Sequence, residues 1–378
     1  MARERSDVGT YDDIAAAAVR TTGLSDFGGT EHEAGLRLLV DDLNAPTAGL
    51  TGVGNYMQRA QVKSALVGRL LSQHGFGAHP GYAEVKIERP IFVVGLPRTG
   101  TTALHRLLTV DERHQGLEVW LTEYPQPRPP RETWEADPIF AGINAAYSQH
   151  HIESPEFMGI HYIDATTVEE CWRILRQAGM SISYESLADV PNYSAWLAAQ
   201  DWTPAYERYK ANLQLIGMND QDRRWVLKNP SHLAALDALM AVFPDALVVQ
   251  THRDPVVSIA SACSLSAEAT AGWSTTFVGE RIGETQLEML ARSHASFAEA
   301  RKKYDPAQFV DVDYREFVAN PISVTRSIYD AFGLDWSKQV ATEVEAMDAE
   351  SKKGGRRPAH QYSLADYGLT EEQVRAAF

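Results

Sequence analysis

Residues 91–102 read IFVVGLPRTGTT, an apolar run followed by two glycines that flank a short loop. An apolar run of this length that ends at turn residues predicts a buried β-strand. Where such a strand passes through a glycine-bearing loop into a helix, backbone N–H groups and the helix dipole point at one spot. The stretch therefore predicts an α/β fold with an anion-binding loop at its first strand–helix junction.

The loop resembles the GxxxxGK[ST] pattern of nucleoside triphosphate-binding proteins without completing it. Position 101 is Thr, so the lysine that reaches the β- and γ-phosphates in that pattern is missing. Instead, Arg98 places a permanent cation with five N–H donors inside the loop. A P-loop kinase therefore stays an alternative, and so does a turn that uses glycine for packing alone.

The same order of strand and helix recurs further along the chain. RWVLK at 224–228 precedes NPSHLAALDALMAVF, ALVVQTH at 246–252 precedes RDPVVSIASACSL, and FVDVDY at 309–314 precedes NPISVTRSIYDAFGL. Short apolar strands that alternate with helices predict a central, mainly parallel sheet flanked by helices. Ligands of such sheets bind at the carboxyl ends of the strands.

The 378 residues include 35 Lys and Arg against 50 Asp and Glu, a formal charge of −15, and 44% are hydrophobic. This composition is typical of a globular protein. An acidic surface repels nucleic acid and anionic bilayers, so we expect no nucleic-acid partner and a local basic site for any anionic ligand. Cys171 and Cys263 form no disulfide or zinc pattern. Because we find no secretory signal and no transmembrane-length apolar run, we expect a cytoplasmic protein.

Changes in the spacing of apolar residues and in composition divide the chain into segments. Residues 1–88 have apolar residues at helical spacing and predict an N-terminal helical arm, and residues 89–378 form the α/β domain. Within that domain, residues 115–215 are an insert that we expect to be a helical cap on the sheet. Residues 350–370 are a C-terminal loop rich in glycine and basic residues.

The insert is unusually aromatic. Between residues 115 and 210, 14 of 96 positions are Phe, Trp or Tyr, whereas the whole chain has 9%. We expect most of these side chains to lie in the core and a few to line an apolar ligand pocket.

A basic residue follows the strand at 246–252. Arg253 stands at its end, Asp254 is placed to cap the next helix, and Pro255 suits the first turn of that helix. Ser261 comes eight residues after Arg253, so both side chains reach one anion only if the intervening turn folds back. Taken alone, Arg253 is equally well explained as an ion-pair partner and Ser261 as a buried helix serine.

The strand at 224–228 ends in a second basic residue, Lys228. His232 falls in the first turn of the following helix, which Asn229 is placed to cap. The positive end of a helix dipole disfavours imidazolium, so His232 is expected to be neutral and able to accept a proton. A structural histidine is the alternative.

Taken in order, these motifs resemble the sulfotransferase superfamily, whose members transfer sulfonate from 3′-phosphoadenosine 5′-phosphosulfate (PAPS). GLPRTGTT is similar to the family's loop for the 5′-phosphosulfate, and HRDPVVSIAS to its 3′-phosphate motif. Together with VPNYSAWL and HQYSLADYGL, they look most like the bacterial Arg-type branch over residues 90–370. The resemblance implies an α/β fold with a P-loop-like turn, PAPS as co-substrate, and no metal.

The resemblance also implies where the donor is held. The 5′-phosphosulfate would contact the first loop, at Pro97, Arg98, Thr99, Gly100, Thr101 and Thr102. The 3′-phosphate would contact Arg253 and Ser261. The KGGRR segment looks like the family's C-terminal basic loop, which closes over the same phosphate through Gly354, Gly355, Arg356 and Arg357. Cytosolic eukaryotic members have a lysine in place of Arg98 and an adenine-stacking tryptophan in place of Ala103.

In-line sulfonate transfer needs stabilised charge on the leaving phosphate and a general base for the acceptor. We expect Arg98 and Lys228 to stabilise that charge. By resemblance to the family's Lys…His segment, His232 is the first candidate for the base. Glu170 in TTVEECW is the second, and its alternative is a solvated helix acid paired to an arginine of the same segment.

The predicted reaction is the transfer of sulfonate to a hydroxyl of a small-molecule or lipid-like acceptor. The aromatic cap and the low number of basic residues disfavour a highly charged polysaccharide as acceptor. A kinase and a degenerate nucleotide-binding protein without turnover are the alternatives. The helical arm leaves room for a homo-oligomer, because it would serve an interface as readily as it would pack on the sheet.

Overall fold

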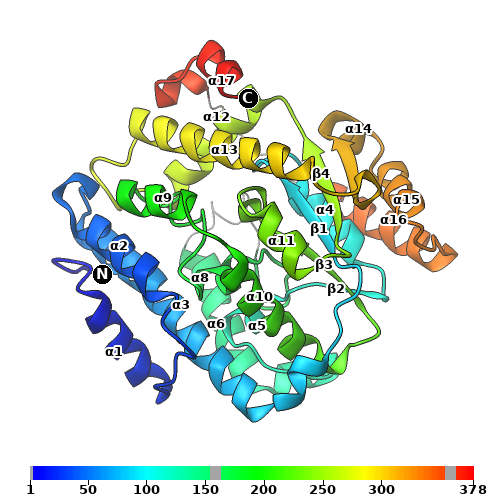
Figure 1. Cartoon of the computed structure of the whole chain (residues 1–378), viewed down its shortest axis with the longest axis horizontal. Coiled ribbons are helices and arrows are strands. Elements are labelled where there is room, and N and C mark those ends of the chain that lie inside the picture. The colour runs from blue at the N-terminus through cyan, green and yellow to red at the C-terminus, as the bar shows by residue number, and fades with distance from the viewer. Residues whose placement is uncertain (1–2, 154–162, 354–362) are drawn as a thin grey trace.

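The computed structural model describes residues 3–153, 163–353 and 363–378 (Figure 1). Within these residues, five parallel strands form one sheet in the order β2-β3-β1-β4-β5. The strands are β1 Ile91–Gly95, β2 His114–Gln115, β3 Arg224–Lys228, β4 Leu247–His252 and β5 Phe309–Asp313. Helices cover both faces of the sheet, which confirms the predicted α/β fold.

The four strands predicted from the sequence are confirmed to within one residue at each end. The short strand β2 is not predicted, because two residues carry no alternation that would distinguish a strand from a loop. Val93 of β1 lies opposite Lys228 of β3, and Gly95 lies opposite Thr251 of β4. The carboxyl ends of the three central strands therefore meet at one edge of the sheet.

Strand β1 is buried on both faces, and its residues alternate between two hydrophobic clusters. Phe92 and Val94 belong to the larger cluster, on the side of the N-terminal helices and the cap. Ile91 and Val93 belong to the smaller cluster. This division follows from the period of two in a strand, and it explains why the whole run is apolar rather than alternating with polar residues.

The smaller cluster is covered by helices on the right-hand side of Figure 1. They are α4 Thr101–Thr109, α14 Tyr314–Ala319, α15 Pro321–Ala331 and α16 Lys338–Lys353. The opposite face carries the 3₁₀ helix η5 and three helices, which are η5 Pro230–Leu233, α11 Leu236–Val242, α12 Pro255–Ala269 and α13 Glu280–Arg301. The predicted capping residues Asn229 and Asp254 do accept hydrogen bonds from Ser231 N and Val256 N.

The insert between β2 and β3 is helical, as expected. Its elements are α5 Val119–Glu123, η3 Arg131–Ala136, α6 Pro138–Glu153, α8 Trp172–Arg176, α9 Pro191–Ala198, α10 Thr203–Ile216 and η4 Gly217–Asn219. Most of its described aromatic side chains are buried in the larger cluster, among them Trp120, Trp134, Tyr193, Tyr206 and Tyr209. The aromatic excess of the insert therefore mainly builds the core.

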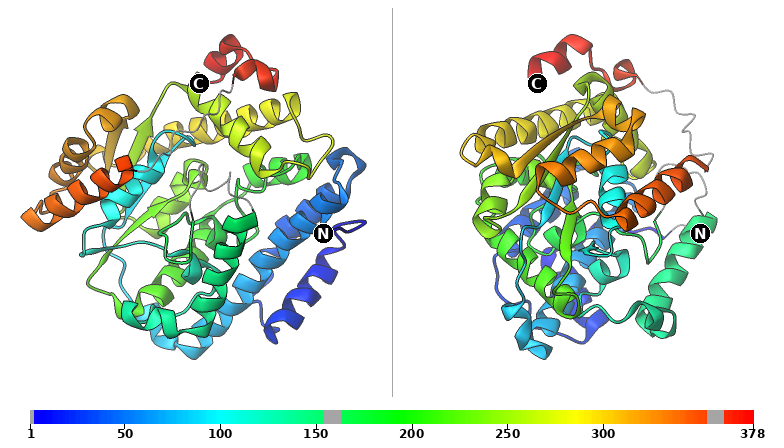
Figure 2. Two further views of the ribbon diagram at one scale, coloured as in Figure 1. Left: turned by 180° about the vertical axis from the view of Figure 1, so that it is seen from behind. Right: turned by 90° about the vertical axis from the view of Figure 1, so that its right-hand side faces the viewer.

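The N-terminal helices lie along the outside of the cap (Figures 1 and 2). They are α1 Tyr11–Thr22, α2 Glu33–Asn44, η1 Pro46–Ala48, α3 Gly52–Ala78 and η2 Pro80–Glu84. Ile14, Leu36 and Leu66 share the larger cluster with Phe92 of the sheet. The described helices thus share one core with the sheet, and the division at residue 88 stays a prediction. The remaining elements are η6 Pro306–Gln308, η7 Leu364–Tyr367 and α17 Glu371–Ala377.

Candidate active site

The loop after β1 brings a helix N-terminus to the carboxyl edge of the sheet. Gly95 has φ +153°, and a Cβ there would lie 2.2 Å from Thr251 Oγ1 of β4. Gly100, at φ +88°, precedes α4, and within the described residues no side chain caps that helix. The first N–H groups of α4 are therefore donors without a side-chain acceptor, which is the arrangement that binds anions.

A cleft of about 400 Å³ lies at this edge, and we call it the strand-end cleft. Residues that follow β1, β3, β4 and β5 line one part of it, and residues of the cap, α12 and α13 line the other part. The predicted site residues that line it are Pro97, Arg98, Gly100, Thr101, Thr102, Glu170, Lys228 and Arg253. Arg98 and Lys228, which are 130 positions apart, thus meet in one space, because the strands β1 and β3 are neighbours.

Arg98 connects the first loop to the segment after β4. Its backbone is left-handed, at φ +69°, which is uncommon for a bulky residue. Its Nε donates a hydrogen bond to Ser261 Oγ at 3.1 Å, and its carbonyl accepts one from Arg253 Nη1 at 2.7 Å. The Arg253 guanidinium also lies 4.2 Å from the centre of the Tyr314 ring. Arg253 and Ser261 are therefore linked through Arg98.

Lys228 links the same loop to the cap. Its Nζ donates to Thr102 Oγ1 at 3.0 Å and forms an ion pair with Glu170 Oε1. Asn229 Nδ2 donates to the other carboxylate oxygen of Glu170 at 3.2 Å. The Lys228 side chain is only 2% exposed, whereas that of Glu170 is 21% exposed. The carboxylate therefore neutralises a buried ammonium group and still reaches the cleft.

Glu170 is thus not the solvated helix acid that the sequence left open as an alternative. The nearby Arg173 pairs instead with Glu123, at 3.5 Å, and donates to Tyr147. Glu170 therefore has one side that lines the cleft and another that pairs with Lys228.

His232 lies in the core and is not among the residues that line the strand-end cleft. Its ring is fully buried, with Nδ1 2.6 Å from the Tyr206 hydroxyl and the ring of Phe92 packed edge-on at 5.1 Å. Burial, together with the charge of Lys228, lowers the pKa of His232 to about 3. The imidazole is therefore neutral, as the sequence suggested, but because of burial rather than a helix dipole.

Other predicted donor-binding residues lie outside the cleft wall. Thr99 is 1% exposed, and its hydroxyl bonds to the Leu96 carbonyl at 2.7 Å and to Thr251 Oγ1 at 2.6 Å. Ser261 lies behind Arg98, which it orients. The predicted residues of the basic loop fall outside the described residues, and they are Gly354, Gly355, Arg356 and Arg357.

Several cleft residues were not predicted. Tyr314 directly follows β5, so the same rule that singled out Arg253 would have found it. Ser183, Ser186 and Met289 carry no local signal, because the cap and α13 reach the cleft through long-range packing. Ser183 accepts a hydrogen bond from Arg176 Nε at 2.8 Å.

In residues 3–153, 163–353 and 363–378, no group of three or more His, Cys, Asp and Glu side chains could hold a metal ion. None of the helices in these ranges combines the length and the apolar character needed to cross a membrane.

Comparison with known proteins gives a family match. The model of a family described as "Sulfotransferase family" matches residues 90–338. A crystal structure of sulfotransferase STF1 from Mycobacterium tuberculosis H37Rv is 51% identical, with a TM-score of 0.92 and 99% of each chain covered. A crystal structure of sulfotransferase STF9 from Mycobacterium avium is 27% identical, with a TM-score of 0.87. The match covers 99% of this chain and 96% of that chain.

Curated relatives match more distantly. Proteins of Mycobacterium bovis and Mycobacterium tuberculosis, each named omega-hydroxy-beta-dihydromenaquinone-9 sulfotransferase Stf3, are 27% identical over 267 residues. The match covers 65% of this chain and 63% of each relative, so the chain spans less than two thirds of their length.

Proposed function

Because the chain belongs to the sulfotransferase family, we propose that it transfers the sulfonate group of PAPS to a hydroxyl of a lipid-like acceptor. The curated relatives are named for a hydroxylated menaquinone derivative, and only the chemical class of that acceptor is extended to this chain. The kinase interpretation is not favoured, since the matching relatives are named sulfotransferases.

One observation carries the proposal. Arg98 and Arg253 follow the strands β1 and β4, Lys228 ends β3, and all three line a single cleft in a chain whose formal charge is −15. Glu170 compensates the charge of Lys228, and the guanidinium groups of Arg98 and Arg253 favour a polyanionic ligand in the same cleft. The residues present therefore fit PAPS, which carries several negative charges.

The donor would lie along the loop after β1. The N–H groups at the start of α4 and the hydroxyls of Thr101 and Thr102 would bind the 5′-phosphosulfate, with Arg98 beside it. Arg253 would bind the 3′-phosphate, with its guanidinium held against Tyr314. Ser261 would act by holding Arg98 in place.

Glu170 is the proposed general base, and Lys228 the group that stabilises charge. During transfer, the acceptor oxygen forms a bond to sulfur while the bond from sulfur to the 5′-phosphate oxygen breaks. The proton of the acceptor hydroxyl passes to Glu170. Lys228 contacts both Glu170 and Thr102, so its charge lies between the base and the donor loop, where negative charge grows on the leaving phosphate.

The first experiment is calorimetric binding of the donor product, adenosine 3′,5′-bisphosphate. The wild-type protein should bind it, and Arg253→Ala should weaken binding about 10- to 100-fold, because a charge-assisted contact is lost. Arg326→Ala is the matched control, since Arg326 is 63% exposed and pairs only loosely with Asp330, at 4.0 Å. Absence of binding to the wild-type protein would overturn the proposal.

Thermal unfolding separates a sulfotransferase from a kinase. Ligands that bind the folded state raise the melting temperature. We expect adenosine 3′,5′-bisphosphate to protect the protein and ATP with Mg²⁺ to give no comparable protection. The reverse order of protection would favour the kinase.

Two expectations about the protein in its cell extend the proposal. A cytoplasmic location accords with the free, buried state of Cys171 and Cys263, and fractionation of the source cells tests it. Self-association remains a prediction that light scattering tests.

A further inference from the structure

A buried guanidinium group lies behind the wall of the strand-end cleft. It belongs to Arg176 of α8, which is only 3% exposed. Its Nη1 donates to Gln61 Oε1, and the centres of the Trp172 and Tyr184 rings lie 4.3 and 4.6 Å from its Cζ. Among the described residues, no carboxylate forms an ion pair with Arg176, and its hydrogen-bond acceptors are all uncharged oxygens. Its charge is therefore uncompensated.

Two other cations near the cleft do have carboxylate partners. Lys228 pairs with Glu170, and Arg173 pairs with Glu123 at 3.5 Å. Burial lowers the pKa of Arg176 to about 10, so its guanidinium is still charged at neutral pH. Burying a charge without a partner is unfavourable. A cation that is kept in this state beside a cleft indicates a ligand with electron-rich atoms.

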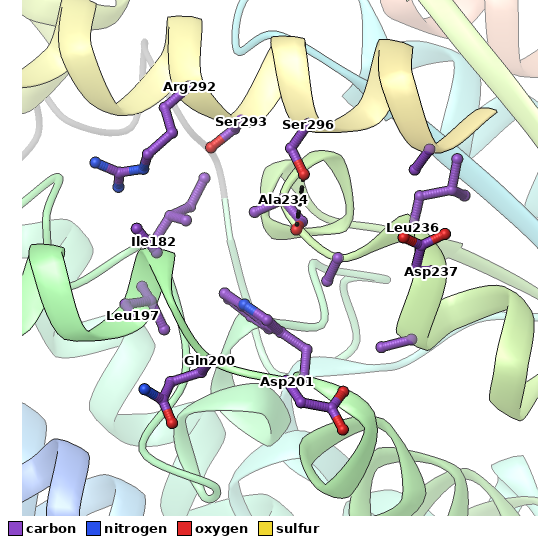
Figure 3. Close-up of a pocket in the computed structure, with 15 residues that line it drawn as sticks. Ile182, Leu197, Gln200, Asp201, Ala234, Leu236, Asp237, Arg292, Ser293 and Ser296 are labelled. Atoms are coloured by element: carbon purple, nitrogen blue, oxygen red, sulfur yellow. Dashed lines mark hydrogen bonds between the residues drawn. The ribbon is translucent and has the colours of Figure 1, made fainter. Parts of the chain in front are cut away.

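A cation on the far side of the cleft wall is compensated as well. Ile182 is nearly buried and separates the strand-end cleft from a second hollow, which lies between α9 and α13 (Figure 3). Arg292 lines that hollow and donates to Glu185 at 2.6 Å. The charge of Arg292 is thus used within the protein, whereas that of Arg176 is not.

Arg176 acts on the cleft through Ser183, which lines the cleft and is half-buried. Ser183 Oγ accepts a hydrogen bond from Arg176 Nε at 2.8 Å and lies 2.7 Å from Ser181 Oγ. Ser181 is fully buried, and in the part of the chain that the structure describes the Ser183 hydroxyl is the one acceptor for its hydroxyl proton. Ser181 therefore donates to Ser183, and both lone pairs of Ser183 Oγ are used. The proton of the Ser183 hydroxyl is left to donate to a ligand, and the guanidinium strengthens it as a donor.

Ser183 is distinct from the proposed base and from its neighbour in the cleft, Ser186. The Ser186 hydroxyl donates to the Ile182 carbonyl at 3.3 Å, so it already has an acceptor within the protein. No hydrogen bond between described residues joins Ser183 to Glu170 or Lys228. Because both of its lone pairs are occupied, Ser183 cannot take a proton from a ligand. It is therefore a second polar contact of the cleft, which suits an atom that only accepts a hydrogen bond.

We propose that Ser183 donates a hydrogen bond to an oxygen of the sulfonate acceptor other than the one that receives sulfonate, while the reacting hydroxyl lies at Glu170. The sulfonate acceptor then carries an electron-rich oxygen, of the carbonyl type, on the same carbon skeleton as its hydroxyl. Arg176 is a positioning residue, because it acts through Ser183. This inference rests on the proposed function, and it adds a specificity-determining residue and a substrate class.

Two pairs of alcohols with matched shapes test the hydrogen bond. They are 3- and 4-(hydroxymethyl)acetophenone, each compared with the isopropylbenzyl alcohol of the same substitution, in which a methyl group replaces the carbonyl oxygen. Calorimetry measures their binding to the protein with adenosine 3′,5′-bisphosphate bound, where no transfer occurs. In at least one pair the ketone should bind about 10-fold or more tightly, because its counterpart leaves the Ser183 hydroxyl unpaired.

A matched pair of serine variants locates the contact. Ser183→Ala should remove the preference for the ketone, because the donor is lost. Ser186→Ala should keep the preference, because the Ser186 hydroxyl already donates to a backbone carbonyl. Neither variant should change the binding of the bisphosphate, which reports on folding and on the donor site.

Infrared spectroscopy of the bound ketone tests the part played by Arg176. A hydrogen bond from a polarised donor lowers the stretching frequency of a carbonyl group. The frequency should therefore be lower in the wild-type complex than in the Ser183→Ala complex. Arg176→Met removes the charge and keeps a long side chain, so it should move the frequency part of the way toward the Ser183→Ala value. A purely structural role of Arg176 would weaken the binding of both alcohols of a pair and leave the frequency unchanged.

The outcomes separate this inference from the proposed function. If the bisphosphate binds but neither ketone is preferred over its isopropyl counterpart, or if Ser183→Ala and Ser186→Ala behave alike, the inference is wrong. An equal carbonyl frequency in the wild-type protein and in Arg176→Met overturns the role of Arg176. If the bisphosphate itself does not bind, the proposed function fails.

Discussion

Replacing Glu170 by Gln keeps the size of the side chain and removes the charge that faces Lys228. Removing one partner of a fully buried ion pair costs about 3–5 kcal/mol, because the other charge is left uncompensated. Lys228 is almost fully buried, but Glu170 is 21% exposed, and the Gln oxygen can still accept a hydrogen bond from Lys228. We therefore expect a smaller loss, about 2 kcal/mol, which for a chain of this length lowers the melting temperature by about 2–3 °C.

The same substitution should lower the rate of sulfonate transfer about 10²- to 10⁴-fold, since the general base is lost. The assay measures transfer from radiolabelled donor, with thermal unfolding followed in parallel by circular dichroism. Glu284→Gln is the control, because Glu284 pairs with Arg281 at 2.8 Å but is 53% exposed. That exposed pair contributes at most about 1 kcal/mol, and its loss should leave transfer unchanged.

Two results would refute this reasoning. Unchanged transfer by Glu170→Gln, with bisphosphate binding intact, would show that Glu170 is not the base. Adding Lys228→Met to Glu170→Gln should restore most of the lost stability, because the buried ammonium group is then gone as well. A further loss of stability in the double variant would contradict the electrostatic explanation.

Three further predictions concern the loop and the core. Gly95→Ala should destabilise the protein by about 3 kcal/mol in chemical denaturation, because a Cβ would collide with Thr251. Gly77→Ala is the control. A Cβ there would have nothing within 4 Å, so this variant should be as stable as the wild-type protein or more stable. His232→Phe should cost about 1–3 kcal/mol, because it leaves the Tyr206 hydroxyl without its partner. The folded variant should keep its transfer activity, and loss of that activity would favour His232 over Glu170 as the base. Burial lowers the pKa of three histidines from 6.5, to about 4 or below, and these are His32, His105 and His232. Below pH 6.5 the unfolded chain binds protons that the folded chain does not, so stability is complete above pH 6.5 and falls toward pH 4 by up to about 4 kcal/mol per pH unit. Urea unfolding at pH 7 and pH 5 measures this, and equal stability at the two values would contradict it.

The strands could be predicted from the sequence because their signal is local. In β1, the apolar run indicates a strand that is buried on both faces, and the glycine at its end indicates the start of a turn. Neither signal depends on residues far away in the sequence. The position of Arg98 and Arg253 at strand ends followed in the same way, since parallel strands bring their carboxyl ends to one edge.

Side-chain direction could not be predicted in this way. His232 is four residues from Lys228, but the η5 turn places Ser231 at the cleft and His232 in the core. Spacing alone does not encode that choice, because it depends on which neighbours fill each side of the turn. Likewise, the contact between Lys228 and Glu170 joins residues 58 positions apart, and it exists only because the cap folds back over the sheet.

The two bonds of Arg98 have a consequence for selectivity among nucleotides. Its side chain bonds to Ser261 and its carbonyl to Arg253, so one residue belongs to both phosphate-binding regions of the proposed donor site. The free-energy costs of changes at Arg253 and in the first loop should then be non-additive, as they are for groups in one network. A nucleotide that lacks a 3′-phosphate would leave Arg253 unengaged and also loosen the loop at the 5′ end. The protein would thus bind mononucleotides without a 3′-phosphate more weakly, by more free energy than the one missing contact contributes.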